Sequence, residues 1–239
     1  IFQDEQGSFA LAGNDTLRGA ARSVIMTETE GRSNYYAMNL TVDRHRADKN
    51  YSFRFIYTLS YLENNTEDIN FRARDANNFE DEWGPALNDR RHIFNTILTY
   101  FPIEGFSATV AAIFQSGQPV NRVPDATVFG TTDLNGDGRS FSQQFVGNND
   151  RSPGESRNSD RLPWNTTFDL NLQYSLPVAG GRVVAGADIF NLFNAENLGG
   201  FSSNLTQSNQ IQVGPPERGI TKRNVAPPRQ FQFSLKYLF

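Results

Sequence analysis

The segment at residues 51–62 reads YSFRFIYTLSYL and alternates apolar with mostly polar side chains over its whole length. One face would carry only apolar and aromatic side chains, namely Tyr51, Phe53, Phe55, Tyr57, Leu59 and Tyr61. A period of two indicates a β-strand, in which successive side chains point to opposite faces. Strands of soluble proteins usually have only about 6 residues. At ~3.3 Å per residue and a tilt of ~45°, this strand would span about 28 Å, close to the thickness of the hydrocarbon core of a bilayer.

The same alternation recurs in six further segments of the chain. They are residues 35–43, 92–101, 106–115, 164–176, 182–191 and 231–239. A weaker pattern at residues 23–30 allows an eighth strand. Because no segment carries apolar residues at helical spacing, the sequence predicts an all-β fold with seven or eight strands.

The connections between these segments alternate between short and long. The short ones are residues 44–50, 102–105 and 177–181, and the long ones are residues 63–91, 116–163 and 192–229. In an antiparallel sheet the short connections would all lie at one end, together with the C-terminus. Outer-membrane barrels have short periplasmic turns and long extracellular loops. The pattern therefore predicts antiparallel strands of a transmembrane β-barrel, with residues 1–239 as a single barrel segment.

The overall composition excludes several classes of function and is compatible with a barrel. The chain has 239 residues, no cysteine, a net charge of −4 and a pI near 5.3. The absence of cysteine excludes disulfide scaffolds and thiolate chemistry. The acidic balance argues against a nucleic-acid partner. The low mean hydropathy of −0.53 is also expected of barrel strands, which are apolar only at every second residue.

The sequence offers no catalytic motif, so we expect no enzymatic activity. His45 and His92 are the only histidines, and neither has a second ligand at metal-binding spacing. The acidic cluster at residues 80–82 is expected to lie in a solvated loop that could contact a substrate. Arg54 and Asp169 are expected on the polar face of the sheet, where they would line a solute route or pair with a plug.

Several motifs, taken in their order along the chain, resemble a known family. They are SNYYAMNL at residues 33–40, YTLS at 57–60, NDRRHIF at 88–94, SGQP at 116–119, DLNGDG at 133–138, NDRSPG at 149–154, RNS at 157–159, FDLNL at 168–172 and DIFNLFN at 188–194. With the closing residues 231–239, the series resembles the C-terminal barrel of TonB-dependent outer-membrane receptors. The similarity is greatest to the Oar-like branch, which often carries an N-terminal carboxypeptidase-regulatory-like domain.

This resemblance implies a barrel of about 22 strands closed around an N-terminal plug. The chain would be the C-terminal third of that barrel, without the plug and the other strands. The resemblance also implies the outer membrane of a Gram-negative bacterium and the uptake of a large, scarce solute. The implied partners are outer-membrane lipid, the barrel-assembly machinery, TonB through the plug region, and an unidentified extracellular solute, with no nucleic acid.

Two alternatives stay open at this point. One is a small closed outer-membrane barrel with an adhesive or structural role, built from these strands alone. The other is a soluble secreted β-sandwich that binds glycans through its aromatic faces. Because the apolar faces of a barrel must contact lipid, dependence on detergent would separate the barrels from the sandwich.

A metal site is suggested by one loop. Asp133, Asn135 and Asp137 occupy the first, third and fifth positions of an EF-hand-type Ca²⁺ loop, and a glycine follows them. The twelfth position is Gln144 rather than the expected glutamate, and no flanking helices are expected. The hypothesis is Ca²⁺ bound in an extracellular loop, and the alternative is a simple turn-forming cluster.

The last predicted strand carries a pattern of its own. Phe233, Leu235, Tyr237 and Phe239 alternate up to the last residue, which resembles the signal that the barrel-assembly machinery recognises. An ordinary amphipathic strand is the alternative. Aromatic residues near strand ends would form the interfacial girdles of a barrel. These residues are Tyr51, Tyr61, Tyr100, Trp164, Tyr174 and Tyr237.

Overall fold

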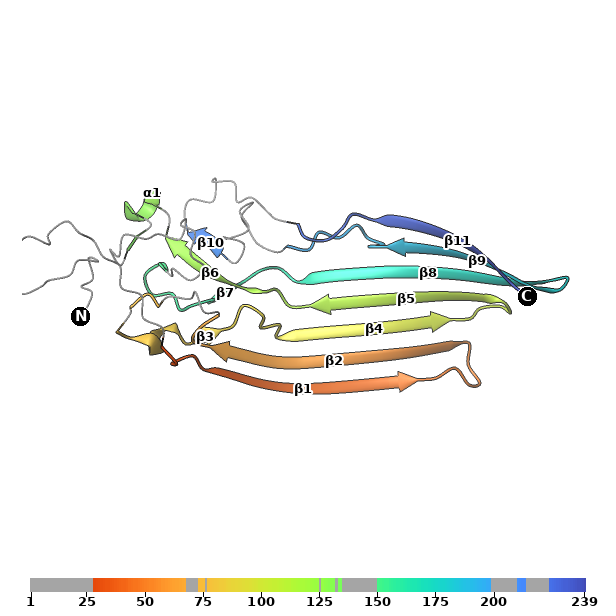
Figure 1. Cartoon of the computed structure of the whole chain (residues 1–239), viewed down its shortest axis with the longest axis horizontal. Helices are drawn as coiled ribbons and strands as arrows, with labels where there is room; N and C mark the ends of the chain where they lie inside the picture. Colours follow the sequence, from red (N-terminus) through yellow and green to blue (C-terminus); the bar gives the residue numbers. More distant parts are fainter. Residues whose placement is uncertain are drawn as a thin grey trace, which may run out of the picture.

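A computed structural model describes residues 28–67, 73–75, 77–124, 126–131, 133–134, 150–198, 210–213 and 224–239. Its main feature is one antiparallel sheet of long strands (Figure 1). In spatial order these are β1 (Ser33–Arg44), β2 (Tyr51–Asn64), β4 (His92–Tyr100), β5 (Phe106–Gln115), β8 (Asn165–Val178), β9 (Gly181–Phe190) and β11 (Gln230–Leu238). The predicted all-β fold is confirmed, and all seven clear periodic segments are long strands.

Several short elements within the long connections were not predicted. They are η2 (Phe79–Glu82), β3 (Gly84–Pro85), β6 (Pro119–Pro124), α1 (Ala126–Phe129), β7 (Asp160–Arg161) and β10 (Gln210–Val213). β3 pairs with the end of β2, and β10, β6 and β7 form a separate small sheet. The eighth strand expected at residues 23–30 is wrong for residues 28–30, which are not in a strand, and residues 23–27 lie outside the described part.

All three short turns lie at the same end of the sheet as the C-terminus, and the long connections lie at the other end (Figure 1). We call these the turn end and the loop end. The β4–β5 turn needs a glycine, because Gly105 has φ +80° and a Cβ there would lie 2.5 Å from the carbonyl oxygen of Ser175. The backbone N–H of Ser175 donates to the carbonyl of Gly105 at 2.8 Å, so this turn is fastened to β8.

The strand register places the predicted apolar sets on one face of the sheet. Tyr57 lies opposite Phe94, and Phe94 lies opposite Phe114. At the other edge, Phe233 lies opposite Ala187. Directly opposed residues share a face, so the apolar sets of all seven strands form one surface. We call it the apolar face and its opposite the polar face.

The apolar face has no protein covering in the described part of the chain. Phe233 and Leu235 are 79% and 76% exposed, although both belong to the regular strand β11. The buried apolar residues all lie outside the long strands, and they are Ala86, Val120, Leu162 and Leu198. Contiguous exposed apolar surface of this extent indicates contact with a membrane or a partner. Among the described residues, no helix is long and apolar enough to cross a membrane.

The long sheet is a single open layer. β1 and β11 are its edges, and each is hydrogen-bonded to only one neighbour among the described strands. A β-sandwich requires two sheets packed face to face, whereas the small second sheet lies at the loop end rather than over the long strands (Figure 1). The architecture therefore does not support the glycan-binding sandwich.

Candidate functional site

Among the described residues, the three shortest of the ion pairs between two long loops lie at the loop end of the sheet; a longer one joins Arg151 to Asp81 at 3.8 Å. The carboxylates come from the β2–β4 connection and the guanidinium groups from the β5–β8 connection. The three shortest pairs are Glu82 with Arg151, Glu67 with Arg157, and Asp89 with Arg161. We call these six residues the loop clamp, because each pair joins segments that are far apart in the sequence.

The Glu82–Arg151 pair is sealed from solvent. The two side chains are 0% and 1% exposed, and Arg151 Nη1 donates to Glu82 Oε2 at 2.6 Å. The second carboxylate oxygen of Glu82 accepts the backbone N–H of Arg74 at 2.7 Å. A buried carboxylate is tolerated only when it is paired and hydrogen-bonded in this way. The prediction of a solvated acidic cluster is therefore wrong for Glu82 but holds for Glu80, which is exposed.

Arg157 is the centre of the loop clamp, because its guanidinium contacts four other residues. Nη1 donates to Glu67 Oε1 at 2.5 Å, and Nε donates to the carbonyl of Glu82 at 2.7 Å. Nη2 donates to the carbonyl and the side-chain oxygen of Asn64 and, at 3.3 Å, to the carbonyl of Gly84. Burial lowers the pKa of Arg157, and the carboxylates of Glu67 and Glu82 oppose that shift.

Close packing around Arg157 also constrains its neighbours. A Cβ at Gly84 would lie 2.6 Å from the carbonyl oxygen of Arg157, so only glycine fits there. Asn158 has φ 54°, a left-handed conformation that asparagine accepts more readily than most residues. Its backbone N–H donates to Asn121 Oδ1 at 2.6 Å, and its Nδ2 donates to the carbonyl of Pro85 at 2.7 Å. The segment after Arg157 is thereby attached to both β3 and β6.

The third pair fastens the loop clamp to the sheet itself. Asp89 is buried, and its Oδ1 accepts the backbone N–H of Leu62 in β2 at 2.9 Å. Arg161, which is hydrogen-bonded to its carboxylate, also donates to the carbonyls of Asp89 and Gly117 at 3.1 and 3.3 Å. Next to them, burial and the charge of Arg161 lower the pKa of Arg90, which donates to a backbone carbonyl at 3.1 Å.

Three of the six residues of the loop clamp belong to motifs noted in the sequence. Asp89 belongs to NDRRHIF, Arg151 to NDRSPG and Arg157 to RNS. The structure brings these separate motifs together at one rim of the sheet. Sequence reasoning missed their contact and also missed Glu67 and Arg161, whereas it noted Glu82 only as part of a solvated acidic cluster. The unusual density of Arg, Asp and Asn in these loops was the available signal.

In the described parts of the third long connection, asparagine side chains make the fastening hydrogen bonds. Asn191 has φ 51°, and its backbone N–H donates to Asp169 Oδ1 at 2.8 Å. Its side chain donates to the carbonyls of Ala195 and Pro227 at 3.1 and 2.9 Å. A hollow of about 270 Å³ lies beside this group. Its lining is Thr167, Asp169, Phe190, Asn191, Ala226, Pro227 and Gln230.

The polar face carries cross-strand polar pairs. Arg54 Nε donates to Asp43 Oδ1 at 2.6 Å across β1 and β2. The side chains of Asn171 and Asp188 are hydrogen-bonded across β8 and β9 at 2.5 Å, and those of Thr99 and Thr109 across β4 and β5 at 3.0 Å. Arg54 and Asp169 both lie on this face, as predicted.

The two histidines are not arranged as a metal site. His92 Nδ1 lies 2.9 Å from the hydroxyl of Tyr57, and its ring stacks on those of Tyr57 and Trp164. His45 is exposed in the β1–β2 turn. Within the described ranges, no group of three or more His, Asp or Glu side chains could hold a metal ion.

The Ca²⁺ hypothesis falls mostly outside the described residues. Asp133 is described, and its backbone N–H bonds to Thr131 Oγ1 at 3.0 Å. Asn135 and Asp137 lie outside the described part. The Ca²⁺ site therefore stays a prediction, and calorimetric titration tests it, because no heat of binding up to millimolar Ca²⁺ would contradict it.

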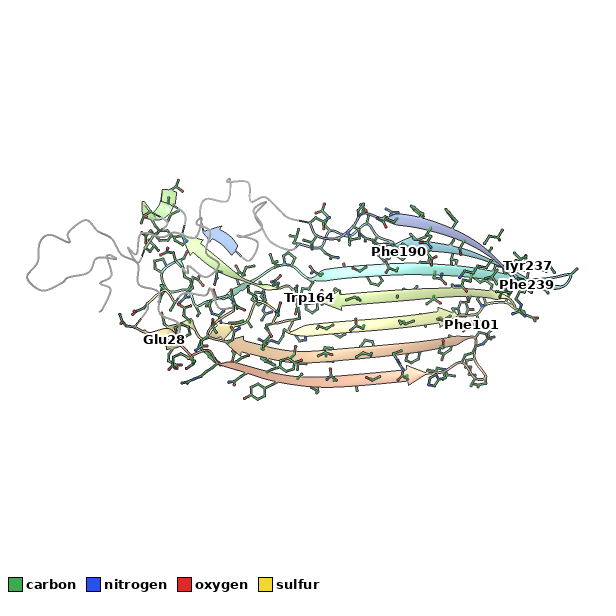
Figure 2. The ribbon with its side chains drawn as sticks, viewed as in Figure 1. Glu28, Phe101, Trp164, Phe190, Tyr237 and Phe239 are labelled. Atoms are coloured by element: carbon green, nitrogen blue, oxygen red, sulfur yellow. The ribbon has the colours of Figure 1, made fainter. Side chains whose placement is uncertain are left out.

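The suggested assembly signal runs along β11 from the middle of the strand to the turn end. Phe233, Leu235 and Tyr237 lie on the apolar face of β11. Tyr237 and Phe239 lie together at the turn end (Figure 2). The rings of Tyr237 and Phe239 are 6.1 Å apart. The geometry is that of an exposed apolar stripe, and recognition by the assembly machinery stays a prediction.

Comparison with known proteins gives one finding. Residues 9–232 match a family model described as an outer membrane beta barrel domain. No curated protein sequence matches the chain.

Proposed function

Because the chain belongs to the outer membrane beta barrel domain family, and therefore lies in the outer membrane of a Gram-negative bacterium, we propose that it is the C-terminal barrel section of a TonB-dependent transporter for a large, scarce solute. The barrel would supply the wall of the route, and the long loops would supply the first binding surface. Gating would belong to a plug that contacts TonB.

The observation that carries this proposal is the open sheet with a polar face. Among the described strands, β1 and β11 leave edge N–H and C=O groups that lipid cannot satisfy, so each edge requires a strand to pair with, and in a wide barrel further strands of the protein would supply them. The polar face presents charged and amide groups, such as Arg54, Asp43 and Asn171, to the side opposite the lipid. A wall of this kind suits a wide, hydrated barrel, whereas a barrel of about 8 strands has an interior just filled by side chains.

The loop clamp supports a binding role for the loops. Buried ion pairs hold the β2–β4 and β5–β8 connections against each other at the end that faces outward in this family. A surface that is ordered before binding loses less conformational entropy when a solute arrives. The loop clamp is thus a positioning device for a receptor surface.

The width of the barrel is tested in the full-length parent protein, expressed in a Gram-negative host with and without its proposed plug. Vancomycin is the probe, because an intact outer membrane excludes it. A wide barrel without its plug should sensitise the cells to vancomycin, while the intact receptor should not. Unchanged resistance with verified surface expression would instead support the small closed barrel.

The coupling to energy is tested separately. The purified periplasmic domain of TonB should be retained by the intact receptor and lost when the segment ahead of the plug is deleted. If no TonB is retained by a receptor that does sensitise cells after plug removal, the transporter is not TonB-dependent, and the wide-barrel part of the proposal stands.

A further inference from the structure

The β1–β2 turn is the basic corner of the sheet at the turn end. Arg44 ends β1, and Arg46 and Lys49 follow within the turn. Asp48 is the only carboxylate in the turn. The β4–β5 turn carries Glu104 and no cation, and the β8–β9 turn carries no charged residue. We call Arg44, Arg46 and Lys49 the basic turn.

Both arginines of the basic turn lie over aromatic rings. The Cζ atom of Arg44 is 4.8 Å from the ring centroid of Tyr51, and that of Arg46 is 4.0 Å from the ring centroid of Phe101. Tyr51 lies on the apolar face, and Phe101 lies at the turn end, where the long strands stop (Figure 2). Stacking on a ring uses the face of the guanidinium and leaves its in-plane N–H donors free to bind an acceptor.

The positive charge of the basic turn is only partly matched. Asp48 lies 3.5 Å from Arg44 Nη2 and 3.6 Å from Lys49 Nζ, so one carboxylate serves two cations. Arg46, which is exposed, forms no ion pair with any described residue. The basic turn therefore has donors and charge to spare for an anion.

We propose that the basic turn binds the phosphate of an anionic glycerophospholipid in the periplasmic leaflet. In a barrel the turn end is periplasmic, and the apolar face places acyl chains directly beside the cations. A guanidinium presents paired N–H donors that match two phosphate oxygens, and Lys49 adds a third charge. This inference depends on the membrane orientation of the barrel and not on TonB or on transport.

The test uses the full-length parent protein, delipidated in a neutral detergent, with retained lipid counted by native mass spectrometry. Phosphatidylglycerol is the probe, zwitterionic phosphatidylcholine is the comparison lipid, and inorganic phosphate is the competitor. Each cation removed should weaken phosphatidylglycerol binding about fivefold, in the series R46Q, R44Q/R46Q and R44Q/R46Q/K49Q. Arg182→Gln is the matched control, because Arg182 lies near the same end on the polar face.

The outcomes separate the alternatives. Equal retention of phosphatidylglycerol by the wild-type protein and the triple variant, or equal loss in Arg182→Gln, would overturn the site. Retention of phosphatidylcholine as strong as that of phosphatidylglycerol would contradict the proposed selectivity for an anionic lipid. Displacement of phosphatidylglycerol by millimolar inorganic phosphate would identify a free anion as the ligand and contradict the proposal that the ligand is a lipid. R46Q is not expected to disturb folding, because this exposed side chain forms no ion pair among the described residues. Circular dichroism checks that each variant is folded.

Discussion

Arg157 connects segments of the chain that lie 73 to 93 residues away from it. Its guanidinium is buried, yet it bonds to the carboxylate of Glu67 and to the backbone carbonyls of Asn64, Glu82 and Gly84. Burial lowers its pKa, but arginine stays protonated in proteins, so the loop clamp holds a permanent charge. The planar fork of donors is what this site uses, and lysine could not replace it.

Replacing Arg157 with methionine should open the β2–β4 loop in the full-length protein. The change removes the cation from Glu67, which is only 15% exposed, and the loss of one partner from a buried ion pair typically costs about 3–5 kcal/mol. Hydrogen exchange of residues 79–89 should become much faster, and the exchange of the long strands should not change. Arg32→Gln is the matched control, because the Arg32–Glu80 pair is 64% and 72% exposed and such pairs contribute about 1 kcal/mol or less. Similar exchange in both variants would show that the clamp does not hold the loop.

At the level of strands, the sequence predicted nearly everything that is local. The alternation at residues 51–62 and 231–239 is a period-two pattern, and each segment forms a strand. The contacts of the long loops could not be predicted in the same way. Glu82 was expected in solvent because its partner Arg151 is 69 residues away. The short strand β3 likewise depends on distant partners, because it pairs with β2 and its Gly84 carbonyl accepts from Arg157. Pairing over such distances has no local signal.

The two faces of β11 should respond in opposite ways to a new charge. Phe233→Arg places a cation on the apolar face, and near the bilayer centre this costs about 2–4 kcal/mol. Gln232→Arg is the matched control, because Gln232 lies on the polar face opposite Asp188, where a cation finds a partner. Folding of the full-length protein into vesicles, followed by chemical denaturation, should show a large loss only for Phe233→Arg. Equal losses would mean that the apolar face does not contact lipid.

The end of the same strand should govern assembly. Deleting Phe239 removes the last aromatic side chain of the apolar stripe, so outer-membrane yield in cells should fall severalfold. Leu238→Ala is the matched control, because Leu238 pairs with Arg182 and lies on the polar face. The ratio of membrane-inserted to total protein is the measurement. An unchanged ratio after deletion would contradict a role for Phe239 as an assembly signal.

At the scale of the whole molecule, the two open edges and the apolar face determine how the isolated chain should behave. The described part of residues 1–239 exposes the edges of β1 and β11 and the apolar face, so we expect the isolated chain to aggregate in plain buffer and to form heterogeneous species in detergent. Light scattering coupled to size exclusion, with and without detergent, measures this. A folded monomer in plain buffer would contradict contact between the apolar face and lipid. A uniform, heat-resistant monomer in detergent would show that these strands close on themselves, and it would replace the wide transporter with the small closed barrel.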